Sequence, residues 1–181
     1  MRTLTIVAHP DLPGSRINRA WADAARQETS VTVHELYAAS PGGRLDIGRE
    51  QRLLDSHDRI VFQYPLYWYS TPPLLKQWFD EVLERGWAFG PGGEHLANKE
   101  IGLAVSTAGT AESYRPEGYN RFAVRDLLLP MQALAYHVGA SPLPPFLLHD
   151  ARNVTEAELA ASAEAYRRYL TEAVSSEEPT I

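Results

Sequence analysis

Short apolar, β-rich runs alternate with longer segments along the 181-residue chain, and this alternation constrains the fold more than any other feature. The runs predicted as strands are residues 4–8, 31–36, 60–63, 101–106 and 143–148. Each connection is long enough to contain a helix, which parallel strands require. The order therefore predicts an α/β fold with a doubly wound, five-stranded parallel sheet, strand order 2-1-3-4-5, and helices on both faces.

The connecting segments carry helix signals of their own. Helices are predicted at residues 17–25, 48–56, 74–85, 122–138 and 155–174. Ser15 is an N-cap candidate for the first helix, Gly86 closes the third, and Pro130 should kink or restart the fourth. Thr155 and Glu158 form a capping-box pattern at the last.

The remaining segments read as loops. Loops are predicted at residues 38–45, 87–97 and 110–120, and a frayed tail at 175–181. No composition shift or internal repeat divides the chain. Residues 1–181 are therefore predicted to form one domain.

Composition and charge exclude several classes of protein. The net charge is −6 and no basic block is present, so nucleic acid is not an expected partner. The chain has no cysteine, which excludes disulfides, thiolate metal sites and cysteine nucleophiles. The apolar run within residues 1–8 is too short for a signal peptide, and no run of about 18 apolar residues could span a membrane. These features predict a cytoplasmic protein.

An aromatic segment follows the third predicted strand, within the sequence QYPLYWYSTPPLLKQWFD. Tyr64, Tyr67, Trp68 and Tyr69 surround Pro65 before the next helix begins. Four large aromatic residues within six positions at the end of a strand predict a wall for a flat, aromatic ligand. The alternative is that these side chains belong to the core or to a dimer contact.

Two other loops of unusual composition, residues 9–18 and 106–109, also follow predicted strands. Ligands of doubly wound sheets bind outside the carboxyl ends of the strands. In the order 2-1-3-4-5 the first, third and fourth strands are neighbours. The three loops are therefore expected to converge.

The two loops suggest different contacts. Ser15 and Asn18 lie at a predicted helix N-terminus, which favours an anion such as phosphate, although Ser15 could serve only as an N-cap. His9 could donate to the same phosphate or merely end a strand. The segment STAG at 106–109 would let backbone N–H groups approach a planar heterocycle, or it could be an ordinary turn. Neither GxGxxG nor a P-loop is present.

No protein side chain stands out as the carrier of the chemistry. The chain has no G-x-S-x-G or HExxH motif, and its six histidines show no spacing typical of metal ligands. His34 and His137 are expected to be structural, and Asp55, Asp58 and Glu81 to lie on solvated helix faces. We therefore expect no metal site, and a bound redox cofactor could supply the chemistry.

These motifs together match a known family. The chain resembles the flavodoxin-like NAD(P)H:quinone oxidoreductases, particularly the small ancillary quinone reductase subunits of glutathione-regulated potassium efflux systems. The resemblance covers residues 5–149 and rests on YPLYWYSTPPLLKQWFDEV, GWAFG, STAG, LPPF and on His9-Pro10 with Ser15 and Asn18. It implies a flavodoxin-like fold and an FMN site, with FAD as the alternative cofactor and NAD(P)H as the co-substrate.

The resemblance also assigns residues to the flavin site. The phosphate-binding segment matches His9, Ser15, Arg16, Ile17 and Asn18. The segments around the isoalloxazine ring match Pro65, Leu66, Tyr67, Trp68, Tyr69, Ser106, Thr107, Ala108 and Gly109. Ala108 replaces a glycine that is frequent in the family. Tyr114 matches a catalytic tyrosine of longer relatives, and Tyr119 or Asn120 is the candidate substitute for their catalytic histidine.

The implied reaction is a ping-pong, two-electron transfer. NAD(P)H delivers a hydride to flavin N5 and leaves, and a quinone then takes its place and leaves as the hydroquinone. Relatives are homodimers whose site is closed by the neighbouring chain. Residues 87–95 and 112–122, with the helix at 74–85, are therefore expected to face a partner.

Several other functions stay open on the residues alone. One is a regulatory subunit with secondary reductase activity that docks on a potassium antiporter at the inner face of the cell membrane. Another is an azo- or nitro-compound reductase. A one-electron flavodoxin carrier is disfavoured, because the loop at 9–18 lacks the phosphate pattern of such carriers. The last open possibility is an α/β domain that binds no flavin.

Overall fold

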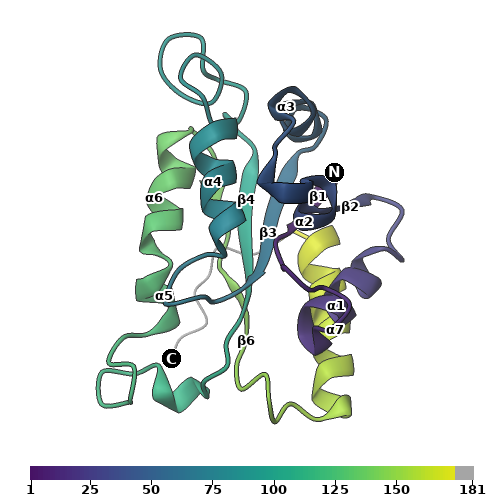
Figure 1. Ribbon diagram of the computed structural model, residues 1–181, viewed down its shortest axis with the longest axis vertical. Helices are drawn as coiled ribbons and strands as arrows, with labels where there is room; N and C mark the ends of the chain where they lie inside the picture. The colour runs from purple at the N-terminus through teal and green to yellow at the C-terminus, as the bar shows by residue number, and fades with distance from the viewer. Residues whose placement is uncertain (174–181) are drawn as a thin grey trace.

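The chain forms a parallel sheet in the predicted order. The structure is a computed structural model that describes residues 1–173. Its strands are β1 (Thr3–Val7), β2 (Val31–Glu35), β3 (Arg59–Pro65), β4 (Glu100–Ser106), β5 (Ser141–Pro142) and β6 (Phe146–Leu148). They pair in parallel in the order β2-β1-β3-β4-β5, and β6 also pairs with β4 (Figure 1). The predicted flavodoxin-like topology is confirmed.

Helices cover both faces of this sheet. They are α1 (Arg16–Ala25), α2 (Leu36–Ala39), α3 (Ile47–Asp55), α4 (Pro73–Val82), α5 (Val124–Leu127), α6 (Leu129–His137) and α7 (Glu156–Thr171), with 3-10 turns η1 (Pro41–Gly43) and η2 (Ala111–Ser113). In Figure 1, α4 and α6 lie on one side of the sheet, and α1 and α7 pack together on the other. None of the helices within residues 1–173 has the length and apolarity needed to cross a membrane.

Aromatic side chains fill both layers between the sheet and the helices. On the α4 side, the Phe62 ring meets the rings of Trp78 and Phe79 edge-on, with centroids 5.4 and 5.0 Å apart. On the α1 and α7 side, the Trp21 ring lies 5.3 Å from that of Tyr166. Each such pair contributes about 0.5–1.5 kcal/mol beyond simple burial. These contacts fix the strands whose carboxyl ends carry the candidate site.

Prolines explain the two largest departures from the predicted elements. The fifth strand forms two short pieces, β5 and β6, because Pro144 and Pro145 lie between them and have no N–H to donate. The helix predicted at 122–138 is divided into α5 and α6. Its second part restarts at Leu129 with Pro130 in the first turn, as predicted for that proline.

Other boundaries shift slightly. Helix α2 begins at Leu36, the predicted end of the second strand, and extends into the loop predicted at 38–45, which also contains η1. Helix α4 ends at Val82 rather than at residue 85, because Leu83 leaves the helical region with a ψ of 64°. The capping box of Thr155 and Glu158 is present at the start of α7. Helix α7 ends at Thr171, and the tail predicted at 175–181 lies outside the described residues.

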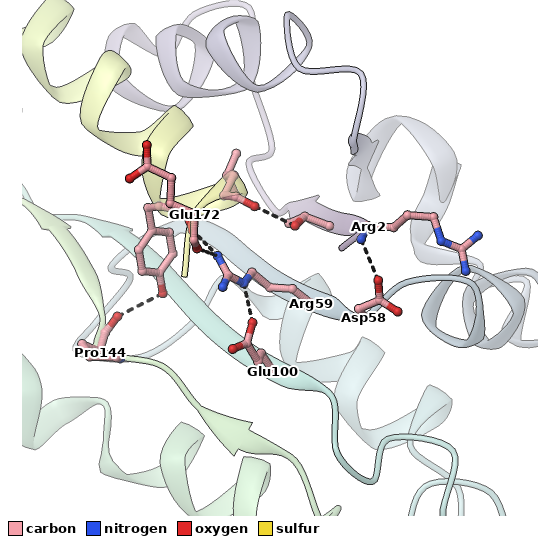
Figure 2. Close-up of polar contacts among 9 residues, drawn as sticks. Arg2, Asp58, Arg59, Glu100, Pro144 and Glu172 are labelled. Atoms are coloured by element: carbon pink, nitrogen blue, oxygen red, sulfur yellow. Dashed lines mark hydrogen bonds and ion pairs between the residues drawn. The ribbon is translucent and has the colours of Figure 1, made fainter. Parts of the chain in front are cut away.

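A polar cluster fastens α7 to the amino end of the sheet (Figure 2). Arg59 is fully buried at the start of β3, and its Nε donates to Glu100 at 2.7 Å. Its Nη1 donates to the carbonyl oxygens of Tyr169 and Glu172 at 2.5 and 2.9 Å. Arg59 therefore satisfies carbonyl groups that the end of a helix leaves without intrahelical partners.

Candidate functional site

A cavity of about 740 Å³ opens at the carboxyl ends of β3 and β4. It is lined by Leu66, Tyr67, Trp68, Tyr69, Ala108, Gly109, Thr110, Ser113, Tyr114, Tyr119, Asn120 and Arg152. The aromatic segment and the STAG loop, which the strand order predicted to converge, thus line one cavity. Its volume lies within the range of small-molecule and cofactor sites.

The aromatic segment forms a tight, strained turn. The backbones of Tyr67 and Ser70 exchange hydrogen bonds of 3.0 and 2.9 Å, which leaves Trp68 and Tyr69 as the central residues. Both have a positive φ, 46° and 63°, which aromatic residues rarely adopt. Such strain costs about 1–3 kcal/mol per residue and is concentrated at functional sites. Because Trp68 is 92% exposed, core packing does not explain its position.

Tyr64, which the sequence pattern predicted in the same wall, belongs to the core instead. Strand β3 continues past its predicted end to Pro65, so Tyr64 is a fully buried strand residue. Burial raises the pKa of its hydroxyl. The wall begins at Leu66, after Pro65 has paired with Ser106 of β4.

The loop after β4 contributes two small residues to the lining of the cavity. Ser106 and Thr107 are buried, whereas Ala108 and Gly109 are lining residues. The Thr107 hydroxyl donates to the Gly109 carbonyl oxygen at 2.9 Å and closes the turn. A Cβ at Gly109 would lie 2.6 Å from Ser113 Oγ, so any larger residue there would displace the neighbouring loop.

His149 supports this loop, although no sequence motif selected it. It directly follows β6, and its Nδ1 lies 2.9 Å from Thr107 Oγ1. Since the Thr107 hydroxyl gives its proton to Gly109, Nδ1 is the donor. Burial lowers the pKa of His149, while Glu112 acts in the opposite direction, so the ring is mostly neutral at pH 7. Its place at the carboxyl end of the last strand was the signal that could have identified it.

The segment 110–121 forms the rim of the cavity and is joined to the aromatic turn. The Tyr69 hydroxyl donates to Asn120 Oδ1 at 3.1 Å, and Asn120 Nδ2 donates to Ser113 Oγ at 3.1 Å. Asn120, a candidate substitute for the family's histidine, is thus a bridge between the rim and the turn. An amide cannot exchange protons as imidazole does, so this position offers hydrogen bonds only.

The two candidate catalytic tyrosines lie at different depths. Tyr114 is half-buried in the wall, and its ring centroid lies 5.9 Å from that of His149. Burial raises the pKa of the Tyr114 hydroxyl, which therefore stays protonated at neutral pH. Tyr119 is 89% exposed at the rim. Tyr114 is accordingly the better placed hydrogen-bond donor inside the cavity.

The predicted phosphate segment lies beside the cavity rather than in its lining. Ser15 is the N-cap of α1, and its Oγ accepts from the Asn18 backbone N–H at 3.2 Å. Asn18 Nδ2 donates to Ser106 Oγ at 3.1 Å, which connects α1 with the loop after β4. The other backbone N–H groups at this helix start still favour an anion.

The remaining residues of that segment could contribute in unequal ways. His9 Nδ1 accepts from the Asp11 N–H at 3.1 Å, which leaves the proton of the neutral ring on Nε2. Burial lowers the pKa of His9, so it is a donor rather than a cation. Arg16 forms an ion pair with Glu156, in which Nη2 lies 2.6 Å from Oε1. Ile17 is buried and could offer only its backbone.

The chemistry of these groups fits a flavin. Tyr67 and Trp68 offer apolar ring surface, the turn at Ala108 and Gly109 offers backbone donors, and the start of α1 offers an anion site. Gln63 Oε1, buried at the end of β3, has no hydrogen-bond partner within residues 1–173. The same residues contain no cluster of three or more His, Asp or Glu side chains that could hold a metal ion.

Comparison with known sequences finds relatives that span nearly the whole chain. A family model described as flavodoxin-like fold matches residues 1–170. The protein named uncharacterized NAD(P)H oxidoreductase YdeQ, from Bacillus subtilis (strain 168), is 48% identical over 171 residues, 94% of this chain and 87% of that protein. The glutathione-regulated potassium-efflux system ancillary protein KefG of Cronobacter sakazakii is 43% identical over 171 residues, 94% and 93% of the two chains.

Solved structures share the fold but carry different names. General stress protein 14 from Treponema denticola, in complex with FMN, has a TM-score of 0.89 and 43% identity over 94% of this chain and 98% of that one. An NADPH-quinone reductase from P. pentosaceus has a TM-score of 0.88 and 33% identity, over 96% of this chain and 99% of that one. A structure described as a thermophilic tryptophan halogenase from Streptomycin violaceusniger has a TM-score of 0.91 and 42% identity, over 94% of this chain and 99% of that one. The scaffold alone therefore does not choose the reaction.

Proposed function

The chain belongs to the family with the flavodoxin-like fold, and from that premise we propose that it is an FMN-dependent NAD(P)H:quinone oxidoreductase. Relatives named as an NAD(P)H oxidoreductase and an NADPH-quinone reductase, and a relative in complex with FMN, support the proposal. These relatives give no support to FAD. The observation that carries the proposal is the meeting of a strained aromatic turn with the backbone of Ala108 and Gly109 in one cavity.

The residues of this chain would divide the binding of the cofactor among them. Contacts with Leu66, Tyr67, Trp68 and Tyr69 would hold the ring, and backbone N–H groups at Ala108 and Gly109 would hydrogen-bond to it. The N-terminus of α1, from Ser15 to Asn18, would bind the phosphate, with His9 Nε2–H as a further donor. Thr107 and His149 would act indirectly, because they hold the turn rather than face the cavity.

The balanced reaction is the conversion of NAD(P)H, a quinone and one proton into NAD(P)⁺ and a hydroquinone. When bound, FMN accepts a hydride from NAD(P)H and passes two electrons to the quinone. Tyr114, whose raised pKa keeps its hydroxyl protonated, would donate a hydrogen bond to a ligand in the cavity. Tyr119 would do so from the rim, where the proton consumed in the reaction is available from solvent.

A shared cavity for both substrates leads to ping-pong kinetics. NAD(P)H and the quinone would use the same space, so the first product must leave before the second substrate enters. Initial velocities measured at several fixed quinone concentrations should therefore give parallel double-reciprocal lines. Intersecting lines would show that both substrates bind at once and would contradict the shared cavity.

Reconstitution tests the function directly. Protein incubated with excess FMN and freed of unbound cofactor should show flavin absorbance, and it should oxidise NADH or NADPH only when a quinone is added. Protein that stays colourless would overturn the cofactor assignment. Flavin-loaded protein that turns over an azo or nitro compound but no quinone would overturn the acceptor assignment and keep the cofactor.

The likeness to KefG supports a second candidate role. We propose docking to a membrane potassium antiporter as an alternative function, because KefG, described as an ancillary protein of potassium efflux, is 43% identical over nearly the full length of both chains. Tagged protein should then co-purify with an antiporter from solubilised membranes of the source organism. Absence of any antiporter in that fraction, with full reductase activity in the tagged protein, would leave only the enzyme.

We also propose a homodimer. Trp68 and Tyr119 are 92% and 89% exposed beside the same cavity, and a second copy would cover this aromatic surface. Sedimentation velocity should show twice the chain mass at micromolar concentration. A monomer that is fully active at every concentration would contradict both the dimer and the idea that a neighbouring chain closes the site.

A further inference from the structure

Arg152 is the single charged side chain among the described residues that line the cavity. The rim segment 110–121 contains two glutamates and two arginines, whose formal charges cancel. The chain as a whole carries a net charge of −6. Arg152 is exposed, and a positive group at the edge of this cavity in an acidic protein would favour an anion there over other parts of its surface.

The backbone that carries Arg152 is fixed to the wall of the cavity. The Ala151 N–H donates to the Thr107 carbonyl oxygen at 3.0 Å, and the Asp150 N–H donates to that of Gly109 at 2.9 Å. Asp150 has a φ of 57°, so the loop reverses sharply there. Arg152 is therefore carried by a turn that is bonded directly to the STAG loop.

The carboxylates closest to Arg152 along the chain have other partners. The two oxygens of Asp150 accept from Asn153 Nδ2 at 2.8 and 3.1 Å. Glu156, at the start of α7, pairs with Arg16 at 2.6 Å. No ion pair in the part of the chain that the structure describes involves Arg152. Its guanidinium is therefore available to a ligand.

We propose that Arg152 selects an electron acceptor whose ring carries an anionic group such as a carboxylate or sulfonate, an inference that rests on the proposed function. The planar guanidinium presents paired N–H donors that match the oxygens of such a group. The aromatic wall would hold the flat part of the same molecule. The phosphates of NAD(P)H are a second source of negative charge, but a single cation matches one anionic substituent better than a diphosphate.

The test compares two acceptors that differ by one charged group, 1,4-naphthoquinone and 1,4-naphthoquinone-2-sulfonate. FMN-loaded wild type, Arg152→Gln, Arg152→Lys and Arg121→Gln would be assayed with both. Arg121 is an exposed rim residue outside the lining set, and its replacement changes the net charge equally. We expect Arg152→Gln to lower kcat/KM about tenfold for the sulfonate and less than about twofold for the neutral quinone.

The controls separate the local contact from general effects. Arg152→Lys should keep part of the preference, and Arg121→Gln all of it. Comparing the sulfonate-to-quinone ratio between variants removes the difference in reduction potential between the two acceptors. Equal losses on both quinones after Arg152→Gln would overturn the proposal. So would a raised KM for NADH or NADPH with an unchanged acceptor ratio, which would assign Arg152 to the co-substrate.

Failure of the proposed function can be recognised separately. If the FMN-loaded wild type reduces neither quinone, titration calorimetry with the same two compounds still measures recognition. Arg152→Gln should then weaken the binding of the sulfonate about tenfold and leave the neutral compound unchanged. Equal affinities of wild type and variant for the sulfonate would overturn the role of Arg152.

Discussion

At the amino end of the sheet a buried arginine donates three hydrogen bonds to β4 and to the end of α7, whereas at the carboxyl end a tryptophan stands exposed on a strained turn. Arg59 is fully buried and bonded to β4 and to the end of α7 (Figure 2). At the same end of the sheet, Thr3 Oγ1 donates to the Leu170 carbonyl oxygen at 2.7 Å. At the opposite end, Trp68 and Tyr69 both hold a positive φ.

The difference suggests that the two ends of the sheet have different roles, one in stability and one in binding. Strain of about 1–3 kcal/mol per residue persists only where the surrounding structure enforces it. The amino end, together with the aromatic core layers, supplies contacts that an isolated turn could not. We infer that one end of the sheet secures the fold while the other keeps an energetically unfavourable turn in place for binding. Variants at the two ends should therefore have opposite signatures.

The largest effect is expected from Arg59→Ala. The change leaves Glu100 and two backbone carbonyl groups without their donor, and breaking a buried pair typically costs about 3–5 kcal/mol. Since Glu100 is 35% exposed, we expect the lower end, about 3 kcal/mol, in urea unfolding. Arg2→Ala is the control, because only its backbone N–H bonds to Asp58. FMN affinity of the folded protein should not change. A large loss of affinity would contradict the inference that the amino end of the sheet contributes to stability and not to binding.

Replacing Trp68 should act in the opposite way. Trp68→Gly removes the ring and accepts the positive φ without strain, so we expect stability to rise by about 1 kcal/mol while FMN dissociates about tenfold more readily. Trp68→Ala removes the same ring but keeps the strain, so it should lose FMN without gaining stability. Thermal unfolding and equilibrium dialysis measure the two quantities. Unchanged FMN retention in both variants would show that Trp68 is not part of the wall.

The fold was predictable because its signals are local and repeated. Apolar runs, a capping box at Thr155 and long connections each pointed to the same parallel sheet. The end of β3 was less certain from sequence, because Tyr64 and Pro65 continue the strand without any change of pattern. This single boundary decided whether Tyr64 belonged to the core or to the site.

The site was predictable only where its residues are neighbours in sequence. The unusual composition of the aromatic turn and of the STAG loop identified both as candidate site segments. The predicted strand order then placed them side by side. His149 and Arg152 carry no motif, and their place depends on hydrogen bonds to Thr107 and Gly109 some forty positions earlier. Such contacts between distant loops arise from the folded register of β4 and β6, which composition does not encode.

A smaller effect on the free energy of unfolding is expected from a change in pH. Burial lowers the pKa of His149 and of His9 below the usual 6.5, so the unfolded chain binds protons more readily than the folded one. This contribution to stability is present above about pH 6.5 and is lost as the pH falls through the lower folded-state pKa values. His149→Gln should reduce this loss, measured by urea unfolding between roughly pH 8 and pH 5.

A substitution without an ionisable group provides the control for this experiment. Gln132→Asn, at an exposed position of α6, should leave the pH dependence as it is in the wild type. His149→Gln should also release FMN more readily, because the donor that holds Thr107 is altered. An unchanged pH dependence in His149→Gln would show that the acid sensitivity does not arise from this residue at the carboxyl end of the sheet.

The smallest effect should come from the link between the aromatic turn and the rim. Tyr69 is 45% exposed, so its hydrogen bond to Asn120 competes with water and should contribute only about 0.5 kcal/mol. A double-mutant cycle with Tyr69→Phe and Asn120→Ala should show this coupling in hydrogen exchange of the Ser70 amide, which the turn protects. Tyr136→Phe, at a tyrosine that is 68% exposed, is the control. A coupling above about 2 kcal/mol would mean that the carboxyl end is stabilised by its own contacts, and the strained turn would not need the rest of the sheet to hold it.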